Sequence, residues 1–412
     1  MKVLIIGGGA SGMMAALTAA EDPNSTVTLL ERQSRVGKKL MATGNGRCNL
    51  TNETLTPANY HGAQPDFVLP ALNGFGVEKT LDFFHDLGLL TVTEETGRVY
   101  PLSDQANSVV DVLRFALDAR GVRVVCSCDI VEVKKKARGW QAISAVGETY
   151  FGDKLIIACG GCAGKKIGGT RSGYHLLSML GHSCTELLPG LTQIKTDTDY
   201  VRALKGVRAD CRLQLKKAGR LLAESAGELQ FTDFGVSGPV GFEVSRAASV
   251  NGDGQTLLLD FLRYYDDAQV LTLLQNKRSA FPALPCEELL SGIVQARLGK
   301  VIVRRAGLDA DAPLARLSGN ELQSIAALLK CFPLHVEGVM GMDSAQVTVG
   351  GVPTSEFDSE TLQSRIVPNV YATGEVLDID GDCGGFNLQW AWSSGRLAGM
   401  LKEKEIHHDT NS

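Results

Sequence analysis

The segment Lys2-Val3-Leu4-Ile5-Ile6-Gly7-Gly8-Gly9-Ala10-Ser11-Gly12 decides how the fold begins. A run of four aliphatic residues is typical of a parallel strand that is buried on both faces. The glycines at Gly7, Gly9 and Gly12 have the spacing G-x-G-x-x-G, and the alanine-rich stretch from Met13 to Ala20 favours a helix. The segment therefore predicts a strand, a tight glycine turn and a helix in immediate succession.

The next strand completes a dinucleotide-binding unit. Val27 to Leu30 is a second aliphatic run, and it ends at Glu31, 19 positions after Gly12. The first glycine of such a unit permits the turn, the second lets a pyrophosphate approach the backbone, and the third lets helix and strand pack closely. The helix N-terminus would bind the phosphates, and Glu31 would accept hydrogen bonds from the adenosine ribose. A carboxylate there disfavours a 2′-phosphate, which leaves FAD or NAD.

The uncharged stretch from Val3 to Ala20 also resembles a signal peptide, because it follows Lys2. Three consecutive glycines would break the helical core of a signal peptide, and the strand that ends at Glu31 favours the dinucleotide-binding unit. No other stretch is long and apolar enough for a transmembrane helix. We therefore expect a cytoplasmic protein without a membrane span.

Length and composition indicate a globular protein of two or three domains, with 412 residues, of which 44% are hydrophobic and 21% charged. The formal net charge of -5 gives no electrostatic footprint for nucleic acid, so no such partner is expected. The 10 cysteines are scattered and suggest reduced thiols. No metal is expected, because the pairs Cys126/Cys128 and Cys159/Cys162 lack histidines at ligand spacing and His407-His408 is interpreted as a solvated tail.

The far end of the chain distinguishes the two dinucleotides. Residues 367–375 predict a buried strand that ends in Gly374 and Glu375, and Gly384-Gly385 opens a helix. This order resembles an element of two-dinucleotide-domain flavoproteins, in which the acid binds the ribityl chain and the helix N-terminus faces the N1/C2 carbonyl edge of the flavin. A helix N-terminus stabilises the anionic reduced ring. An ordinary closing strand and helix would need neither two glycines nor Asn387, whose amide suits a ring carbonyl.

A third element also favours FAD. The apolar strand from Lys154 to Ala158 leads to Cys159-Gly160-Gly161 and resembles the strand–A-T-G-G element beside the cofactor, with Cys159 in place of the usual threonine. A P-loop around Gly164-Lys165 would need a glycine at position 159 and a serine or threonine in place of Lys166. The P-loop is therefore excluded.

Four blocks of the chain resemble a bacterial flavoprotein family that includes aminoacetone oxidase-like proteins and a flavoprotein of bile-acid 7-dehydroxylation operons. Two departures from the family pattern concern the substrate side: Arg171-Ser172-Gly173-Tyr174 replaces a Gly-Asp-Gly-Tyr run, and Asp233 replaces a common histidine. The blocks span nearly the whole chain and cover residues 31–52, 97–103, 227–239 and 349–395.

The resemblance implies an α/β fold in which a Rossmann-like FAD-binding domain is built from both chain ends, residues 1–190 and 345–412. A mixed β-barrel-like and helical insertion interrupts this domain. Sequence patterns support the insertion, because short alternating segments precede Leu262 and a helical period follows from Asp266. We expect a β-rich substrate-side domain over residues 191–265 and 330–344, and a small helical subdomain over residues 266–329.

The resemblance also implies which residues hold FAD without a covalent bond, and it places residues 44–49 along the isoalloxazine. The expected cofactor-binding residues are Gly7, Gly9, Ala10, Ser11, Gly12, Glu31, Arg32, Lys39, Gly44, Gly46, Arg47, Cys48, Asn49, Val131, Cys159, Gly160, Gly161, Gly374, Glu375, Gly384, Gly385, Phe386, Asn387 and Leu388.

Two residues are candidates for catalysis. Arg47 could stabilise reduced flavin or hold an anionic substrate, or it could only brace its own loop or pair with the pyrophosphate. Tyr100 could donate a proton or be a buried aromatic of the core. Cys48 has no partner cysteine nearby, which favours an inert packed thiol. The block from Phe231 to Pro239 is either a wall of the substrate pocket or a strand and turn, and the acidic cluster at 378–382 suits capping better than metal binding.

These features predict an FAD-dependent oxidoreductase that transfers hydride through flavin N5. Because the sequence has no second complete G-x-G-x-x-G unit, NADH or NADPH is expected only as a transient donor. The favoured reaction reduces an activated C=C bond of a small hydrophobic substrate. The alternatives are an amine or aminoketone oxidase that uses O2, and a flavin-containing RNA-modification or regulatory protein. The sequence indicates neither the substrate nor the oligomeric state.

Overall fold

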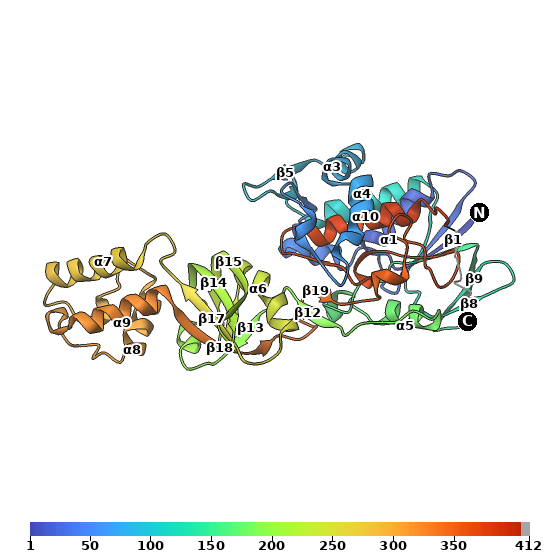
Figure 1. Ribbon diagram of the computed structural model, residues 1–412. Coiled ribbons are helices and arrows are strands. Elements are labelled where there is room, and N and C mark those ends of the chain that lie inside the picture. The colour runs from blue at the N-terminus through green and yellow to red at the C-terminus, as the bar shows by residue number, and fades with distance from the viewer. Residues whose placement is uncertain (405–412) are drawn as a thin grey trace. The chain divides into compact units, whose positions relative to one another are not determined.

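The computed structural model describes residues 1–404, and the chain divides into two compact units. Unit 1 comprises Met1–Leu188 and the chain from Val347 onward, and unit 2 comprises Pro189–Gln346. In Figure 1 the blue N-terminal and red C-terminal elements accordingly belong to one unit. The chain leaves unit 1 at β12 (Leu188–Gly190) and returns at β19 (Val347–Val349). The predicted class, a Rossmann-type α/β fold with a barrel-like insertion, is confirmed.

A five-stranded sheet forms the core of unit 1, and all neighbouring strands in it are parallel. The central strand is buried along Val3–Ile6, as its unbroken aliphatic run predicts. One edge strand comes from the C-terminal part of the chain, so the five-stranded sheet is complete only when both chain ends meet. In spatial order the strands are β20 (Val370–Ala372), β11 (Lys154–Ile157), β1 (Lys2–Ile6), β2 (Thr26–Leu30) and β7 (Arg123–Val125).

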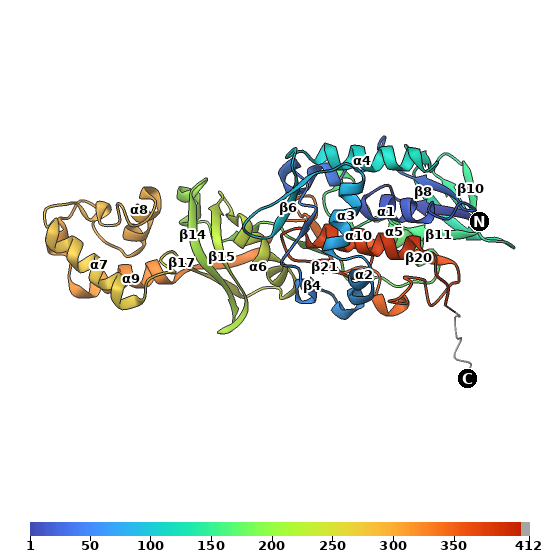
Figure 2. The same cartoon turned by 90° about the horizontal axis from the view of Figure 1, so that it is seen from above.

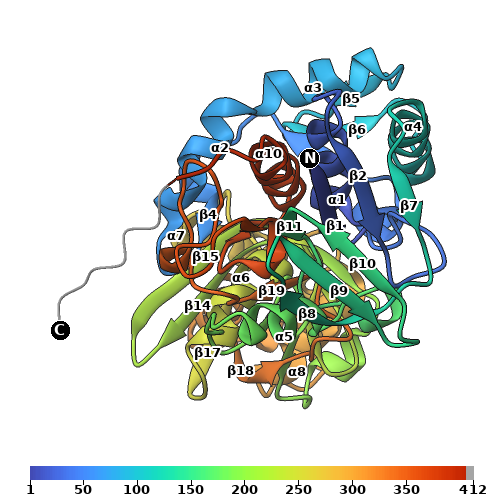
Figure 3. The same ribbon diagram turned by 90° about the vertical axis from the view of Figure 1, so that its right-hand side faces the viewer.

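Two helices from opposite ends of the sequence pack against each other on this sheet, α1 (Ala10–Ala19) and α10 (Phe386–Gly399). Figures 2 and 3 show them side by side. Glycines of α10 permit the close approach, because a Cβ at Gly395 would lie 2.4 Å from the Ser11 carbonyl oxygen, and one at Gly399 would lie 2.6 Å from that of Ala15. Helix α1 lies between the sheet and α10 and is buried along nearly its whole length.

Smaller elements complete unit 1. The basic run at residues 134–136 lies at the end of a strand of a three-stranded antiparallel sheet. That sheet comprises β8 (Ile130–Lys135), β9 (Trp140–Ser144) and β10 (Thr149–Gly152). The other strands are β3 (Thr51–Asn52), β4 (Tyr60–His61), β5 (Thr91–Thr93), β6 (Arg98–Pro101) and β21 (Asp380–Gly381), and the other helices are α2 (Leu69–Gly74), α3 (Val77–Asp86), α4 (Ala106–Ala119) and α5 (Ser172–Met179).

Unit 2 contains a closed six-stranded barrel and four helices. The sequence predicted only short strands up to Leu262, and helix α6 (Pro239–Val250) within that stretch was missed. It starts where Gly238 adopts a φ of +89° and Pro239 occupies the first turn, a position that suits proline. The barrel strands in spatial order are β13 (Ile194–Thr196), β16 (Gly235–Ser237), β15 (Arg220–Phe231), β14 (Arg208–Lys217), β17 (Gln255–Asp260) and β18 (Phe332–Val339).

The three later helices of unit 2 share one hydrophobic core with the barrel. Buried Leu298 and Leu322 belong to the same cluster as Leu213 and Leu257 of the barrel strands. Capping boxes define two helix starts, Asp266 with Gln269 and Ser318 with Glu321, because each pair satisfies backbone N–H groups of the first turn. These helices are α7 (Asp267–Ala280), α8 (Ala296–Arg305) and α9 (Gly319–Lys330). No helix within residues 1–404 is both long and apolar enough to cross a membrane.

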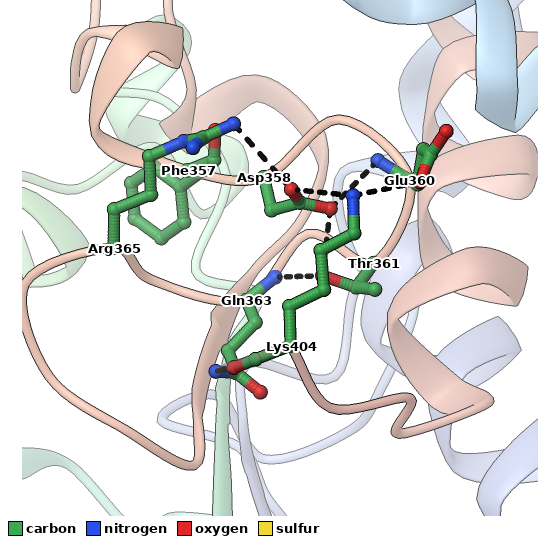
Figure 4. A network of polar contacts seen from close by, with 7 residues as sticks. All are labelled: Phe357, Asp358, Glu360, Thr361, Gln363, Arg365 and Lys404. Carbon is green, nitrogen blue, oxygen red and sulfur yellow. Dashed lines mark hydrogen bonds and ion pairs between the residues drawn. The ribbon is translucent and has the colours of Figure 1, made fainter. Parts of the chain in front are cut away.

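The end of the described chain is tied back to unit 1 by a polar network. The Lys404 Nζ atom donates to Asp358 Oδ2 at 3.0 Å and to Glu360 Oε2 at 2.7 Å, and Figure 4 shows this side chain reaching the two carboxylates. Burial by itself would raise the pKa of Asp358, but the bonds from Lys404, the Glu360 amide and Thr361 lower it overall. The network therefore stabilises the ionised carboxylate.

We predict that Asp358→Asn lowers the thermal stability of the protein at neutral pH by about 1 kcal/mol, because the charge-assisted bonds to half-exposed Lys404 are lost. The folded pKa of Asp358 lies below its unfolded value, so its contribution is complete above about pH 4 and is lost as the pH falls through the folded pKa. Thermal unfolding from pH 7 downward should show the wild-type advantage shrinking. Glu360→Gln, at a more exposed carboxylate, should have less effect, and a pH-independent difference would contradict the assignment.

Candidate cofactor site

The glycine turn after β1 combines two packed glycines with one open position. A Cβ at Gly7 would lie 2.3 Å from the Ala158 carbonyl oxygen, and one at Gly12 would lie 1.9 Å from that of Gly7. Gly9, the N-cap of α1, has no atom within 4 Å of its Cβ position. No side chain caps this helix end among the described residues, so the N–H groups beside Ala10 and Ser11 face open space. This arrangement suits an incoming pyrophosphate.

The Glu31 carboxylate lies beside this turn. Its Oε2 atom accepts from the Gly8 amide at 2.6 Å, and its Oε1 atom accepts from the Gln33 amide at 2.6 Å. Burial raises the pKa of Glu31, and the two amide bonds oppose that rise. The sequence predicted the ribose role of this residue but not that it also holds the turn. The neighbouring Arg32 donates to the Gly168 carbonyl at 3.2 Å.

The segment around η1 (Leu40–Gly46) loops through left-handed backbone conformations. Gly44, Asn45, Gly46 and Cys48 all have φ between 57° and 86°, which glycine and asparagine tolerate best. A Cβ at Gly44 would lie 2.9 Å from the Asn49 amide nitrogen. The glycines are therefore required by this tight path, which brings residues 44–49 toward Tyr100 and the start of α10.

Arg47 and Tyr100 lie together, with the guanidinium 3.9 Å from the ring centroid. The same guanidinium donates to Glu94 at 2.9 Å and to Asp104, so two carboxylates and one ring occupy it. These contacts are those of a loop brace, one of the two roles that the sequence left open. Burial raises the pKa of Tyr100, so its hydroxyl keeps the proton at neutral pH.

The next two residues of the loop are buried. Burial raises the pKa of Cys48 to about 12, and such a protonated thiol is unreactive. Asn49 is 9% exposed, and its Oδ1 atom has no hydrogen-bond partner among residues 1–404. A buried polar atom without a partner is unusual in a folded protein, so this oxygen suits a polar group of a ligand.

Glu375 joins segments from both chain ends. It lies in η9 (Gly374–Val376), where Oε2 accepts from Lys39 Nζ at 2.8 Å and Oε1 accepts from the Thr348 amide at 2.7 Å. A Cβ at Gly161 would lie 2.4 Å from Glu375 Oε1, and one at Gly374 would lie 2.7 Å from Ser11 Oγ. The structure thus brings together five of the residues that the sequence selected from distant positions.

The start of α10 is closely packed and lacks a side-chain cap among the described residues. Gly384 and Gly385 adopt φ values of +142° and +103°, and a Cβ at Gly385 would lie 2.5 Å from the Thr51 carbonyl oxygen. No side chain caps this helix within the described chain. Its first residue, Phe386, is buried, and Leu388 is half-buried.

The predicted role of Asn387 needs correction. Its Oδ1 accepts from the Gly381 amide at 2.8 Å, and its Nδ2 donates to the Gly381 carbonyl at 2.7 Å. The side-chain amide of Asn387 therefore bonds the loop before α10 and offers no free donor to a flavin carbonyl. No sequence signal separates this loop-anchoring role from ligand binding.

Three other predicted residues differ in their surroundings. Val131 is 42% exposed on β8. The Cys159 thiol donates to the Ile6 carbonyl at 3.4 Å, and burial raises its pKa to about 12. Gly160 has a φ of +66°, and nothing lies within 4 Å of its Cβ position. Val131 and Gly160 are therefore accessible, whereas the Cys159 thiol is occupied by a backbone carbonyl.

The acidic cluster at 378–382 supports loops. Asp378 Oδ2 accepts from the Ala63 amide at 3.2 Å, and Asp382 pairs with His61 at 2.7 Å. Within residues 1–404 no group of three or more His, Cys, Asp or Glu side chains could hold a metal ion. None of the ten cysteines, all of which lie within residues 1–404, forms a disulfide bond. The pair His407-His408 lies outside the described residues.

The block from Phe231 to Pro239 contributes to the barrel core. Phe231 and Val236 are fully buried among the core residues of unit 2, and Asp233 pairs with Lys205 at the surface. The side chains of Phe231 and Val236 are thus unavailable as a pocket wall, whereas Phe234 is half-buried and stays a candidate. The strand-and-turn alternative describes residues 231–238, and α6 begins at Pro239.

The open glycine turn, the carboxylate at the end of β2, Glu375 and the unpartnered Asn49 oxygen define a Rossmann-type flavin-binding protein. These residues fit FAD, because they offer donors to phosphates and both donors and acceptors to ribose and ring. A family profile described as "HI0933-like protein Rossmann domain" matches residues 1–401, and the chain belongs to this family. It is an FAD-dependent oxidoreductase.

Two curated relatives and one solved structure show the extent of the similarity. A 3-dehydro-bile acid delta(4,6)-reductase of Clostridium scindens is 38% identical over 97% of this chain and 98% of its own length. A ribosomal RNA dihydrouridine synthase of Escherichia coli is 30% identical over 95% of both chains. A 3-ketosteroid delta1-dehydrogenase from Sterolibacterium denitrificans has a TM-score of 0.50 and 13% identity, covering 97% of this chain and 98% of that chain, which shows a shared fold.

We predict that alanine substitutions at two glycines of the turn affect different properties, protein stability at one and FAD binding at the other. Gly12→Ala places a methyl group against the Gly7 carbonyl and should destabilise the FAD-free protein by more than about 1 kcal/mol. Gly9→Ala meets no protein atom, so it should leave the FAD-free protein intact and weaken FAD binding. Thermal unfolding of the apoprotein and FAD titration measure the two effects. Equal losses of stability in both variants would contradict the assignment of Gly9 to the cofactor.

We predict that Glu31→Gln weakens FAD binding by about 1–1.5 kcal/mol, because charge-assisted hydrogen bonds to the ribose become neutral ones. Titration of the apoprotein with FAD measures this change. Glu31→Ala and Glu31→Gln should in addition both lower the stability of the apoprotein, alanine more than glutamine. The glutamine side chain keeps an oxygen acceptor for only one of the amides of Gly8 and Gln33, and alanine keeps none. Unchanged FAD affinity in the glutamine variant would show that the ribose lies elsewhere.

Proposed function

We propose that this chain reduces a C=C bond conjugated to a carbonyl group in a small hydrophobic molecule. The single observation that carries the proposal is the 38% identity over 97% of the chain to a reductase whose name specifies a 3-dehydro bile acid and its Δ4,6 bonds. A 3-dehydro compound is a ketone, and Δ4,6 double bonds beside it form a conjugated dienone. Such a bond accepts hydride readily because its carbonyl takes up the developing negative charge.

In this proposal FAD is held without a covalent bond by residues of unit 1. The N-terminus of α1 with Gly9 binds the pyrophosphate, Glu31 binds the adenosine ribose, and Glu375 binds the ribityl chain. The N-terminus of α10 at Gly385 stabilises negative charge on the pyrimidine edge of the flavin. When bound, FAD supplies hydride transfer at N5.

The loop from Gly44 to Asn49 would keep its shape during the reaction. Glu94 and Asp104 hold Arg47, and Arg47 covers Tyr100. Tyr100 Oη retains its proton through the neutral range because burial raises its pKa, so this atom can supply a proton to the reduced product. Removing the hydroxyl would leave hydride uptake by FAD unchanged and slow product formation.

NADH or NADPH would act as a reductant that binds and leaves. The sequence contains one complete G-x-G-x-x-G unit, and that unit is assigned to FAD. A second nucleotide therefore has no dedicated turn of the same kind. Reduction and substrate turnover would occur in separate half-reactions.

A ribosomal RNA substrate is the second candidate, favoured by the 30% identity to the dihydrouridine synthase over 95% of both chains. Dihydrouridine arises by reduction of a C=C bond conjugated to a carbonyl, so the chemistry is the same. The net charge of -5 favours the small molecule. One local feature favours RNA instead, because the β14–β15 turn presents Lys217 and Arg220 as exposed cations.

We predict that anaerobic NADH or NADPH bleaches the bound flavin in stopped-flow measurements, and that a 3-oxo-Δ4,6 bile acid then restores the oxidised spectrum. The product should gain two hydrogens per reduced bond by mass spectrometry. Reoxidation by an unmodified ribosomal RNA transcript instead, with dihydrouridine formed, would establish the second candidate. Reoxidation by O2 alone with release of peroxide would identify an oxidase and contradict both.

A further inference from the structure

One buried oxygen of the cofactor site has no use within the protein itself. Asn49 is 9% exposed, and its Oδ1 atom finds no partner in the described chain. This oxygen lies 2.9 Å from the position that a Cβ of Gly385 would occupy, at the start of α10. An unsatisfied buried acceptor destabilises a folded protein, so this oxygen favours a ligand that supplies a donor.

The oxygen is not a helix cap. Capping would require it to accept from a backbone N–H of the first turn of α10, and no side chain makes such a bond in residues 1–404. Nearby Asn52 shows the contrast. Its Nδ2 donates to the Gly384 carbonyl at 2.9 Å, and its Oδ1 accepts from the Thr54 amide at 2.9 Å. Two asparagines of one segment thus lie beside α10, one satisfied and one not.

We propose that Asn49 Oδ1 accepts the hydrogen bond of the flavin N3–H group. The pyrimidine edge of oxidised flavin carries one N–H donor, N3, between the acceptor oxygens at C2 and C4. The site offers a matching pair of groups, since the free N–H groups of α10 are donors and the adjacent Asn49 oxygen is an acceptor. The helix amides suit a ring carbonyl, and the asparagine oxygen suits the donor next to it.

This role makes Asn49 a positioning residue that reads the flavin ring. It fixes which edge of the isoalloxazine faces α10, because a ring turned over would place a carbonyl oxygen against the asparagine oxygen. The contribution of this oxygen to stability changes sign when FAD binds. The unpaired oxygen destabilises the FAD-free protein, and the paired oxygen stabilises the complex. The inference rests on the FAD assignment and is independent of the substrate.

The test compares Asn49→Ala with the matched variant Asn52→Ala. Asn49→Ala should leave the melting temperature of the apoprotein unchanged or higher and weaken FAD binding about fivefold to tenfold, the value of one neutral hydrogen bond. Asn52→Ala should lower the apoprotein melting temperature, because it removes satisfied buried bonds. With FAD labelled with ¹⁵N at N3, the wild type should show a protected N3–H proton by NMR, and Asn49→Ala should lose that signal to solvent exchange.

A second variant tests the acceptor itself. Asn49→Asp keeps an oxygen at the same position, so the protected N3–H signal should persist, while the added charge should lower the reduction potential of the flavin. Loss of the signal in Asn49→Asp would mean that the amide nitrogen is the contacting atom, and it would overturn the proposal. Persistence of the signal in Asn49→Ala, or an apoprotein destabilised as much as Asn52→Ala, would also overturn it. A wild type that binds no FAD would reject the cofactor assignment together with this inference.

Discussion

The close approach of Gly12 to the carbonyl oxygen of Gly7 is the constraint on which the rest of the cofactor unit depends. Only glycine allows α1 to start this close to the end of β1, because any Cβ would lie 1.9 Å from that oxygen. The approach directs the free end of α1 at the open space beside Gly9. It also presents the face of α1 on which α10 packs through Gly395 and Gly399, so the same close packing connects the two ends of the chain.

The polar groups of the site hold one another before any cofactor binds. Glu31 bonds the glycine turn, and Glu375 bonds Lys39 from the N-terminal part of the chain and Thr348 from the C-terminal part. Such preorganisation lowers the cost of ordering side chains when a ligand arrives. Asn49 is the exception, because its oxygen gains a partner only from a ligand. The site therefore combines satisfied groups that fix geometry with one unsatisfied group that favours occupancy.

The sequence predicted the cofactor unit well because local chemistry determines it. The aliphatic run of β1, the glycine spacing and the acid after β2 are all local signals, and the structure forms the predicted strand, turn and helix. It also bonds Glu31 to the turn, a contact that the sequence did not predict. Prediction failed where tertiary partners decide the role of a residue. Asn387 and Phe231 have suitable chemistry for a ligand, but a loop backbone occupies one and the barrel core buries the other. Helix α6 was missed because a Gly-Pro pair suits both a turn and a helix start.

The division of the chain explains how one cofactor scaffold can serve reductases with different substrates. Every group argued to bind FAD lies in unit 1, while the apolar side chains of unit 2 that carry the sequence resemblance, such as Phe231 and Val236, are used in its own core. The two curated relatives are named for a bile acid and for ribosomal RNA, and each aligns with more than nine-tenths of this chain. Their different substrates require differences among residues that neither hold FAD nor fill a core, and these exposed positions are where the specificity of this chain should be sought.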